Sequence, residues 1–432
     1  MDTMRDKIRH REELESDSSE ELEDSSSESA ELEVITNRMK SEEEVIVSEH
    51  NMWLSHVPYL YDSALTHALQ WISPTVQWLP DVIPTNDSDL LSQHRLILGT
   101  HMTAGDLPDL LLVASVPVPN DGTTGEQLAE GYGGQGSVRM DIKIAHEGPV
   151  RRARYMPQNP DFIATQTMDG DVLLFDVSKH PPEPPVGSRC APNARLVGHT
   201  VGGTGLAWSR HRMGYLLSAG YDTTVRLWNV FQHRLQYEAS RVFKAHVAPV
   251  KDVQWHESNA RVFGSVDGAG RLMVWDIRAD NDRTPQLEVG AHNQKCNCLA
   301  FSPHSEASLA TGADDNTVKL WDLRQIRRPI HALEWHRDAV FQVQWAPHNS
   351  SIIGSSGGDR RLHLWDLSII GAEQSEMEAL EGPPELLFIH GGHTGPVMDF
   401  SWNENNDWMV GSVCEGPLLQ VWKISESLYD ED

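Results

Sequence analysis

Six histidines recur along the C-terminal two thirds of the chain, and each one begins a segment of the same length. An Asp, Asn or Lys stands 30 positions after every one of them. A single histidine near an acid would suggest a general base or a metal ligand. A spacing that occurs six times instead indicates a repeated structural unit. The pairs are His146 and Asp176, His199 and Asn229, His246 and Asp276, His292 and Asp322, His336 and Asp366, and His393 and Lys423.

Each repeat alternates short β-forming runs with turn residues. "VFQVQWAP", "IIGSS" and "RRLHLWDL" are one set of three runs, and they predict strands with little helix. The order His, turn Asp and Trp-Asp resembles the WD-repeat family of β-propellers. In that family the His, a Ser or Thr, the turn Asp and the Trp form a hydrogen-bonded network within each blade. We therefore interpret the repeat histidines as structural residues of the blades.

The turn aspartate of that network is not present in every repeat. It stands at Asp169, Asp222, Asp315 and Asp359. The third and sixth repeats have Ala269 and Gly416 in its place. We expect these two blades to depend on packing more than on the hydrogen-bonded network.

Residues 60–140 precede the six repeats and contain three further strand-like runs. These are "QWISPTVQWLPDV", "HRLILGTHM" and "LLLVASVPV". They predict a degenerate first blade, together with the strand that closes the ring against the last blade. Closure removes the sheet edges that an open array would expose. The sequence therefore predicts an all-β, seven-bladed propeller in residues 58–432, with an insertion loop at about 370–384.

The N-terminal part has a different character. Residues 1–40 form an acidic tail rich in Ser and Glu, and "EELESDSSEELEDSSSESAELE" at 12–33 has no aromatic residue. Such a segment buries too little apolar surface to fold, so we expect disorder. Ser18 and Ser25 each precede a Glu by three residues, which suggests phosphorylation by an acid-directed kinase. A tail that only increases solubility explains the same composition equally well.

A helix is expected in residues 41–57. Ser41 and Glu44 have capping-box spacing, and an apolar stripe of helical period follows up to Pro58. A helix that precedes a propeller does not join its sheets. We therefore expect it to pack on the side of the ring.

Charge and composition narrow the classes of function. The formal net charge is −28, which disfavours direct binding to nucleic acid and favours basic partners. No apolar run approaches the roughly 18 residues of a membrane span. Four cysteines are too few for a disulfide scaffold, which suggests a reduced intracellular compartment. No Ser/His/Asp or Cys/His set stands apart from the repeat positions, so we expect no catalytic site, metal site or cofactor.

Longer stretches carry a more specific resemblance. "VPYLYDSALTHALQW", "HEGPVRRARYMPQNPDFIAT", "FQVQWAPHNSSIIGSSGGDRRLHLWDLSIIG" and "EGPPELLFIHGGHT" lie in and between the repeats. With these stretches, about residues 43–430 resemble the retinoblastoma-binding histone chaperones, which include the small subunit of chromatin assembly factor. The resemblance implies a histone-binding subunit of chromatin complexes that is located in the nucleus.

In that family the N-terminal helix and the proline-bearing loop form two sides of a lateral groove. The groove holds the first helix of the fourth core histone by apolar anchors and by acids that face its basic residues. The resemblance assigns these roles to Trp53, Leu60, Glu378, Glu381, Pro383, Pro384, Phe388 and Leu428. Without it, Phe388 is also explained as a strand-core aromatic, and the two acids as an ordinary solvated loop.

The family has a second site on the top face of the ring, where acids receive a basic histone tail. Positions that still match it are His101, Arg152, Asn297, Phe341 and Glu415. Positions that depart from it are Pro149, Arg151, Gly202, Thr204, Lys251 and Ala339. Four of these departures replace a carboxylate, so the resemblance implies a weakened or altered top site.

The resemblance also limits the partners. It implies core histones together with subunits of chromatin assembly, acetyltransferase, deacetylase or polycomb-type complexes. It implies neither direct nucleic-acid binding nor a membrane. The alternative is a WD-repeat scaffold that has lost histone binding and holds another nuclear multiprotein complex together.

Overall fold

A computed structural model describes residues 42–84, 90–102, 108–120, 138–185, 187–231 and 234–429. The expected disordered tail, with Ser18 and Ser25, lies outside these ranges. The chain divides into two compact parts, residues 1–55 and 56–432, and each is described by itself.

Residues 42–60 form a single α-helix, and residues 42–55 of it belong to the first part. The expectation that the helix ends before Pro58 is wrong, because Pro58 lies within the last helical turn. A proline there removes one main-chain hydrogen bond. The next residues are held in place, since the Leu60 carbonyl accepts a hydrogen bond from the Ser425 amide at 3.0 Å. Among the described helices, none is long and apolar enough to cross a membrane.

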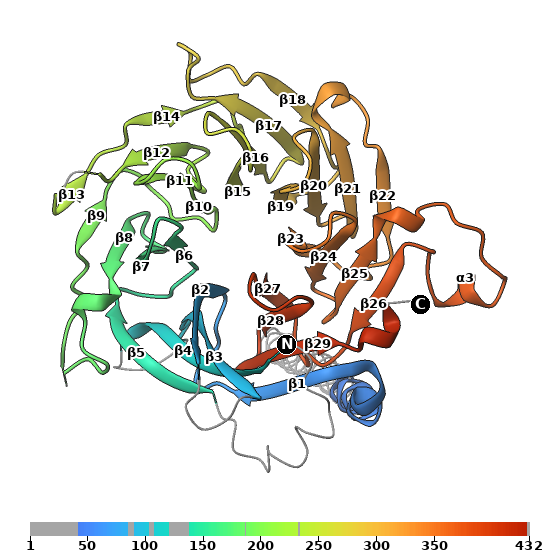
Figure 1. Ribbon diagram of the computed structural model, residues 1–432. Helices are drawn as coiled ribbons and strands as arrows, with labels where there is room; N and C mark the ends of the chain where they lie inside the picture. The colour runs from blue at the N-terminus through green and yellow to red at the C-terminus, as the bar shows by residue number, and fades with distance from the viewer. Residues whose placement is uncertain are drawn as a thin grey trace, which may run out of the picture. The chain divides into compact units, whose positions relative to one another are not determined.

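Seven antiparallel sheets of the second part stand radially in a ring, as the sequence predicted (Figure 1). In chain order, the first blade is β2 (Val76–Pro84), β3 (Leu91–Gly99), β4 (Asp109–Pro119) and β5 (Arg139–His146). The second is β6 (Arg152–Met156), β7 (Asn159–Gln166), β8 (Val172–Asp176) and β9 (Ala194–Leu196), and the third is β10 (Leu206–Trp208), β11 (Tyr215–Ala219), β12 (Val225–Asn229) and β14 (Arg241–Phe243). The fourth is β15 (Val250–Trp255), β16 (Val262–Asp267), β17 (Arg271–Asp276) and β18 (Leu287–Gly290).

The remaining blades have the same pattern. The fifth is β19 (Cys296–Phe301), β20 (Ser308–Ala313), β21 (Thr317–Asp322) and β22 (His331–Glu334), and the sixth is β23 (Val340–Trp345), β24 (Ile352–Gly357), β25 (Leu362–Asp366) and β26 (Leu386–His390). The seventh is β27 (Val397–Trp402), β28 (Met409–Cys414), β29 (Leu418–Ile424) and β1 (Tyr61–Ala68). Short 3-10 helices η1 (Val177–Lys179), η2 (Leu323–Gln325), η3 (Leu367–Ile369) and η4 (Glu426–Leu428) follow outer parts of the blades. An added strand, β13 (Gln236–Tyr237), pairs in parallel with β9.

The ring closes through β1, which comes from the N-terminal end of the propeller and completes the last blade. It pairs antiparallel with β29 from Tyr61 opposite Ile424 to Ala68 opposite Leu418. Apolar side chains reinforce this closure, because Leu96 and Val116 of the first blade share one buried cluster with Val413 and Val421 of the last. The predicted degenerate first blade and closing strand are therefore confirmed.

The hydrogen-bonded network of the WD repeat is complete in four of the described blades. In the third blade, His199 contacts Asp222 at 3.0 Å and Ser218 at 2.8 Å, and the Trp228 indole donates to Ser218. The fifth and sixth blades repeat this arrangement around His292 and His336. The repeat histidines are thus held inside the blades, as the sequence predicted.

The fourth blade corrects one expectation from the sequence. It was expected to lack the acid of the network because Ala269 stands at the turn position. Instead, Asp267 at the end of β16 contacts His246 Nδ1 at 2.8 Å. The turn allows this, since the Ala269 and Arg271 amides both donate to the same carboxylate. Ser265 completes the network with His246 and Trp275.

The second blade departs from its expected network. Its histidine, His146, contacts the Gly148 carbonyl and Thr165 rather than Asp169. Phe175 occupies the place of the indole and packs 5.8 Å from the His146 ring. In the seventh blade, where Gly416 replaces the acid, His393 still contacts Ser412 at 2.7 Å, and Ser412 accepts from Trp422.

These differences predict unequal effects for two conservative substitutions. Asp267→Asn removes a fully buried carboxylate that is hydrogen-bonded to His246, so we expect a loss of roughly 2–4 kcal/mol in the free energy of unfolding. Asp169→Asn is the matched control, because this exposed residue lies outside the His146 contacts, and we expect it to cost less than about 0.5 kcal/mol. Urea unfolding measures both. Equal losses would show that Asp267 contributes no special interaction.

Candidate functional site

The predicted lateral site begins where the ring closes. Leu60 and Leu428 lie on either side of Ser425, whose amide donates to Leu60 and whose carbonyl accepts from the Leu428 amide at 3.0 Å. The Glu426 amide also donates to the Asp62 carboxylate at 3.2 Å. The first and last residues of the propeller are therefore tied into one corner. Of the predicted set, this brings Leu60 and Leu428 together.

Phe388 lies next to this corner on β26. Its ring packs edge-on against Tyr61 at 5.4 Å and lies 6.2 Å from Trp422, and its side chain is 7% exposed. Phe388 therefore joins the sixth blade to β1 and β29 of the seventh. The alternative role as a core aromatic accounts for most of its surface, so little of the ring remains for a ligand.

A buried polar chain lies behind Phe388. His390 stacks on Trp422 with centroids 4.3 Å apart, and its Nδ1 contacts the Tyr61 hydroxyl at 2.8 Å. Its Nε2 contacts Gln420 at 2.7 Å. Burial lowers the pKa of His390 to about 3, and the nearby Arg361 charge acts in the same direction against the Gln420 hydrogen bond. The imidazole is therefore neutral at physiological pH and acts as a structural link.

The insertion between β25 and β26 contains a short helix, α3 (Glu378–Glu381). A capping box holds its start, because the Ser375 amide donates to the Glu378 carboxylate at 2.8 Å and the Ser375 hydroxyl accepts from the Glu378 amide at 3.3 Å. These contacts lower the pKa of Glu378, the backbone hydrogen bond most strongly. Gln374 closes the loop by donating to the Gly382 carbonyl at 3.1 Å.

The insertion returns to the sheet through its two prolines. Gly382 has a φ of 150°, which favours glycine, and Pro383 accepts a hydrogen bond from the Leu386 amide at 2.9 Å. Both Pro383 and Pro384 are half-buried. The next residue, Glu385, is buried and contacts His331 at 2.7 Å. The base of the loop is thus fixed to the blade, and only its outer part is free to meet a ligand.

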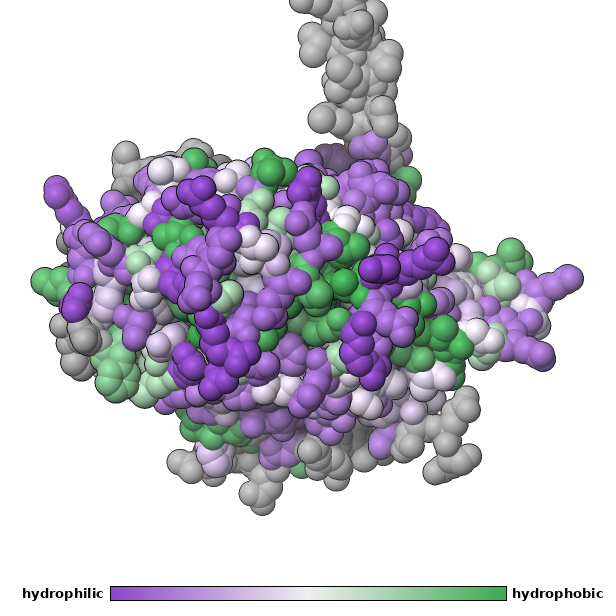
Figure 2. All heavy atoms as spheres, turned by 90° about the horizontal axis from the view of Figure 1, so that it is seen from above, coloured by the Kyte–Doolittle hydropathy of each residue, from purple (hydrophilic) through white to green (hydrophobic). Residues whose placement is uncertain are grey.

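The outer part of the insertion combines negative charge with exposed apolar side chains. Met377 is 78% exposed and Leu380 is 81% exposed, between the exposed acids Glu378 and Glu381. Residues 370–384 contain four Glu and no Lys or Arg. The α3 segment projects from the side of the ring, and hydrophobic and hydrophilic residues are mixed on its surface (Figures 1 and 2). Such a surface suits a cationic amphipathic partner. Sequence reasoning missed Met377 and Leu380, although their spacing around the two acids is visible in the sequence.

Trp53, the remaining member of the predicted groove, lies in the helix of residues 42–60 and belongs to the first part of the chain. Its ring lies 5.4 Å from that of His50. A position opposite the insertion stays a prediction.

The residues predicted for the top face occupy one end of the blades, at the starts of inner strands and in the turns between second and third strands. Arg152 and Asn297 are engaged internally: Arg152 contacts Asp399 at 3.1 Å, and Asn297 donates to Asp314 at 2.7 Å. His101 and Glu415 are exposed and Phe341 is half-buried. Because Arg152 and Asn297 already have protein partners, they offer less to a peptide than the sequence suggested.

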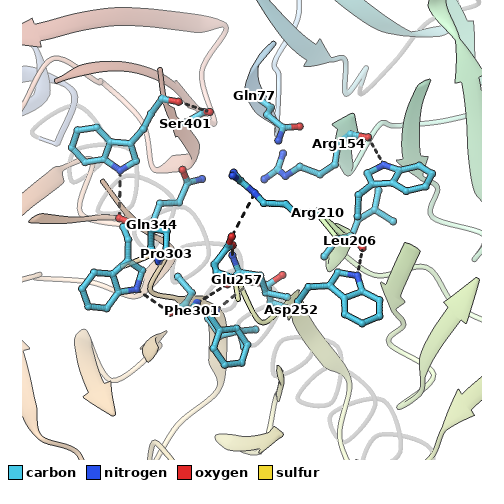
Figure 3. A pocket seen from close by; sticks show the side chains of 18 of the residues that line it. Gln77, Arg154, Leu206, Arg210, Asp252, Glu257, Phe301, Pro303, Gln344 and Ser401 are labelled. Carbon is cyan, nitrogen blue, oxygen red and sulfur yellow. Dashed lines mark hydrogen bonds and ion pairs between the residues drawn. The ribbon is translucent and has the colours of Figure 1, made fainter. Parts of the chain in front are cut away.

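The central channel of the ring contains a polar cavity of about 510 Å³, lined by the inner strands (Figure 3). Asp399 is fully buried and holds both Arg152 and Arg154 at 3.1 Å. Farther along, Arg210 contacts Glu404 at 2.7 Å. Burial raises the pKa of Asp252 to about 6, although Arg152 opposes this effect. The charges of the channel are thus largely paired with one another and serve to link blades.

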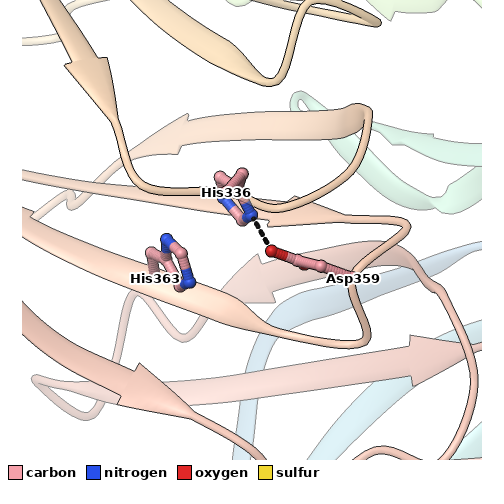
Figure 4. A group of neighbouring side chains, drawn as sticks. All are labelled: His336, Asp359 and His363. Atoms are coloured by element: carbon pink, nitrogen blue, oxygen red, sulfur yellow. Dashed lines mark hydrogen bonds and ion pairs between the residues drawn. The ribbon is translucent and has the colours of Figure 1, made fainter.

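His336, Asp359 and His363 are close enough to suggest a metal site (Figure 4). The rings of the two histidines are stacked, with centroids 3.8 Å apart and an angle of 11° between planes. A metal ion lies about 2 Å from each imidazole nitrogen, near the plane of the ring. Stacked parallel rings do not direct two lone pairs to such a point. The geometry therefore favours the blade network, in which His336 already contacts Asp359 and Ser355.

Comparisons with known protein families agree with this arrangement. Residues 48–120 match the family described as histone-binding protein RBBP4 or its equivalent in the CAF1 complex. Residues 190–229, 283–322, 327–366 and 384–423 match the family described as "WD domain, G-beta repeat". The acidic insertion lies between the last two of these matches. The first match includes Trp53 and Leu60.

The neutral His390 predicts a pH dependence of stability. Its folded pKa of about 3 lies below the usual value of 6.5, so the unfolded chain binds a proton first as the pH falls. Stability from this group is present above about pH 6.5 and is lost progressively toward pH 3. We expect wild type to lose roughly 1–2 kcal/mol more than His390→Asn between pH 7 and pH 5, measured by urea unfolding. Parallel losses in the two proteins would contradict this assignment.

Proposed function

The chain belongs to the histone-binding WD-repeat family that includes RBBP4 and its equivalent in the CAF1 complex, and we propose that it holds the first helix of histone H4 against the α3 insertion and the Leu60–Leu428 corner. It is a histone-binding chaperone or scaffold protein. The acidic and apolar surface of the insertion is the observation that carries this finer proposal.

The apolar contribution comes from a small number of side chains. Leu60 and Leu428 are held together by the backbone around Ser425, and Met377 and Leu380 extend from α3. A helix that enters such a groove uses apolar residues spaced three or four apart on one face. In this proposal, Trp53 on the N-terminal helix lies on the other side of the bound histone helix.

The charged contribution comes from Glu378 and Glu381. The capping contact with Ser375 lowers the pKa of Glu378, so this carboxylate is ionised at neutral pH. Both acids are exposed and lie in a segment without basic residues. A basic helix is therefore attracted during the encounter and oriented when it binds.

We propose that the top face binds a basic histone tail weakly. Arg152 and Asn297 are engaged by protein groups, and four carboxylates expected there are replaced, at Pro149, Gly202, Lys251 and Ala339. Each charge-assisted contact contributes on the order of 1 kcal/mol, so losing four costs well over about 100-fold in affinity.

The families matched are generally non-enzymatic. We propose that the protein acts in the nucleus as a subunit of chromatin assembly, acetyltransferase, deacetylase or polycomb-type complexes. The support is the family match together with a ring that offers separate surfaces on its side and on its face.

Reversing the two acids of α3 tests the groove. We expect Glu378→Lys with Glu381→Lys to weaken binding of a histone H4 first-helix peptide by about tenfold or more, because two attractive contacts become repulsive. Glu238→Lys with Glu306→Lys gives the same change in net charge at exposed positions on other blades and should leave affinity nearly unchanged. Equal effects of the two pairs in a fluorescence anisotropy titration would rule out a specific role for the insertion.

The top face is tested by titrating the full-length protein with an unmodified basic histone-tail peptide. We expect calorimetry to detect no low-micromolar binding, because the carboxylates that would receive the peptide are missing. Low-micromolar affinity would contradict the proposed weakening.

A further inference from the structure

Three neighbouring blades bring two cations onto one aromatic ring at the top face. The Arg151 guanidinium carbon lies 5.5 Å from the centroid of the Tyr221 ring, and Lys251 Nζ lies 4.6 Å from it. Arg151 precedes β6, Tyr221 lies in the β11–β12 turn, and Lys251 lies on β15. All three side chains are half-buried. We call Arg151, Tyr221 and Lys251 the cationic cluster.

The backbone around the cationic cluster is fixed by hydrogen bonds between blades. The Val250 amide donates to Gly220 at 3.2 Å, which places Lys251 beside the turn that carries Tyr221. The Thr204 hydroxyl donates to the Lys251 carbonyl at 2.7 Å. The Arg151 amide donates to Gln166 at 3.2 Å. The three side chains are therefore presented by rigid elements, which reduces the ordering cost of binding.

Neither cation of the cluster has an acidic partner. Across the described ranges, no carboxylate lies within ion-pair distance of Arg151 or Lys251, whereas Arg152, Arg154 and Arg195 all have one. The nearest acids in the sequence are engaged elsewhere. Asp222 accepts from His199 and the Thr200 amide, and Asp252 accepts from the Leu299 and Val253 amides. Two half-buried positive charges around one ring thus lack a counter-ion.

We propose that the cationic cluster binds an acidic peptide segment, with carboxylate or phosphate oxygens on Arg151 and Lys251 and the adjoining peptide against Tyr221. An anion supplies the missing counter-charge, and Arg offers a bidentate contact to such groups. The site differs from the lateral groove in place and in partner charge. It therefore does not depend on histone binding by the insertion.

An acidic peptide fits this site better than a nucleic acid. The positive charge is confined to two residues, and the chain as a whole carries −28, so an extended polyanion meets repulsion beyond the cluster. A short acidic segment needs only the local contacts. Residues 12–33 of this chain are one source of such a segment, and a partner protein is the other.

Fluorescence anisotropy with the full-length protein tests the site. The probes are a labelled peptide of residues 12–33 and an unrelated glutamate-rich peptide, both at low ionic strength. We expect both to bind, and Arg151→Glu with Lys251→Glu to weaken binding by about tenfold or more. Arg327→Glu with Arg328→Glu is the matched control, since these exposed cations give the same change in net charge, and it should leave affinity nearly unchanged.

Two further variants test the ring and the source. Tyr221→Phe keeps an aromatic face for the cations and should keep binding, whereas Tyr221→Ala should weaken it. A full-length variant with every Asp and Glu of residues 12–33 changed to Asn and Gln tests whether this segment occupies the site. Tighter binding of the unrelated peptide would assign the site to the chain's own segment, and unchanged binding would assign it to a partner; both support an acidic-peptide site.

Three results would overturn the proposal: no binding of either peptide, equal affinity in wild type and the cluster variant, or stronger binding of a duplex DNA that displaces the peptides. Capture of the histone H4 helix peptide is measured in parallel. It should be unchanged in Arg151→Glu with Lys251→Glu, which shows that this variant is folded. Failure of the cationic cluster is thereby distinguished from failure of the lateral groove.

Discussion

The pairing of β1 with β29 is the constraint on which the lateral surface depends. A propeller is a ring of separate sheets, so the last blade must be completed by a strand from the other end of the chain. That pairing, from Tyr61 to Ala68, places Leu60 beside Ser425 and Tyr61 against Phe388. Ring closure and the proposed histone groove therefore use the same residues. Substitutions in this corner affect stability and binding together, which is why the exposed acids of α3 are the better probes.

Charges in the propeller have two roles that their partners distinguish. Buried charges are paired inside the protein, as Asp399 is with Arg152 and Arg154, because an unpaired buried charge is strongly destabilising. Exposed charges without partners are concentrated on two surfaces of opposite sign. The insertion presents Glu378 and Glu381, and the top face presents Arg151 and Lys251 around Tyr221. The two surfaces can therefore select partners of opposite charge without competing.

The repeat spacing was enough to predict the blades, since strands, turns and histidines recur in register with a hydrogen-bonded network. It failed where a side chain reached the network from another position. Asp267 replaces the acid missing at Ala269 because the intervening turn directs its carboxylate to His246. Phe388 was predicted as a groove residue, but the structure places most of its side chain between two blades. Tyr221 was missed because its two cations come from sequence positions 70 residues behind and 30 residues ahead of it.

Photo-crosslinking from α3 most directly tests the central claim, that the insertion holds a histone helix. A photoreactive amino acid replaces Leu380, the exposed apolar residue between the two acids, in the full-length protein. After irradiation with the histone H3–H4 complex, mass spectrometry should locate the crosslink in the first helix of H4. Crosslinks confined to histone tails or to H3, or none while the histones remain bound, would contradict the account.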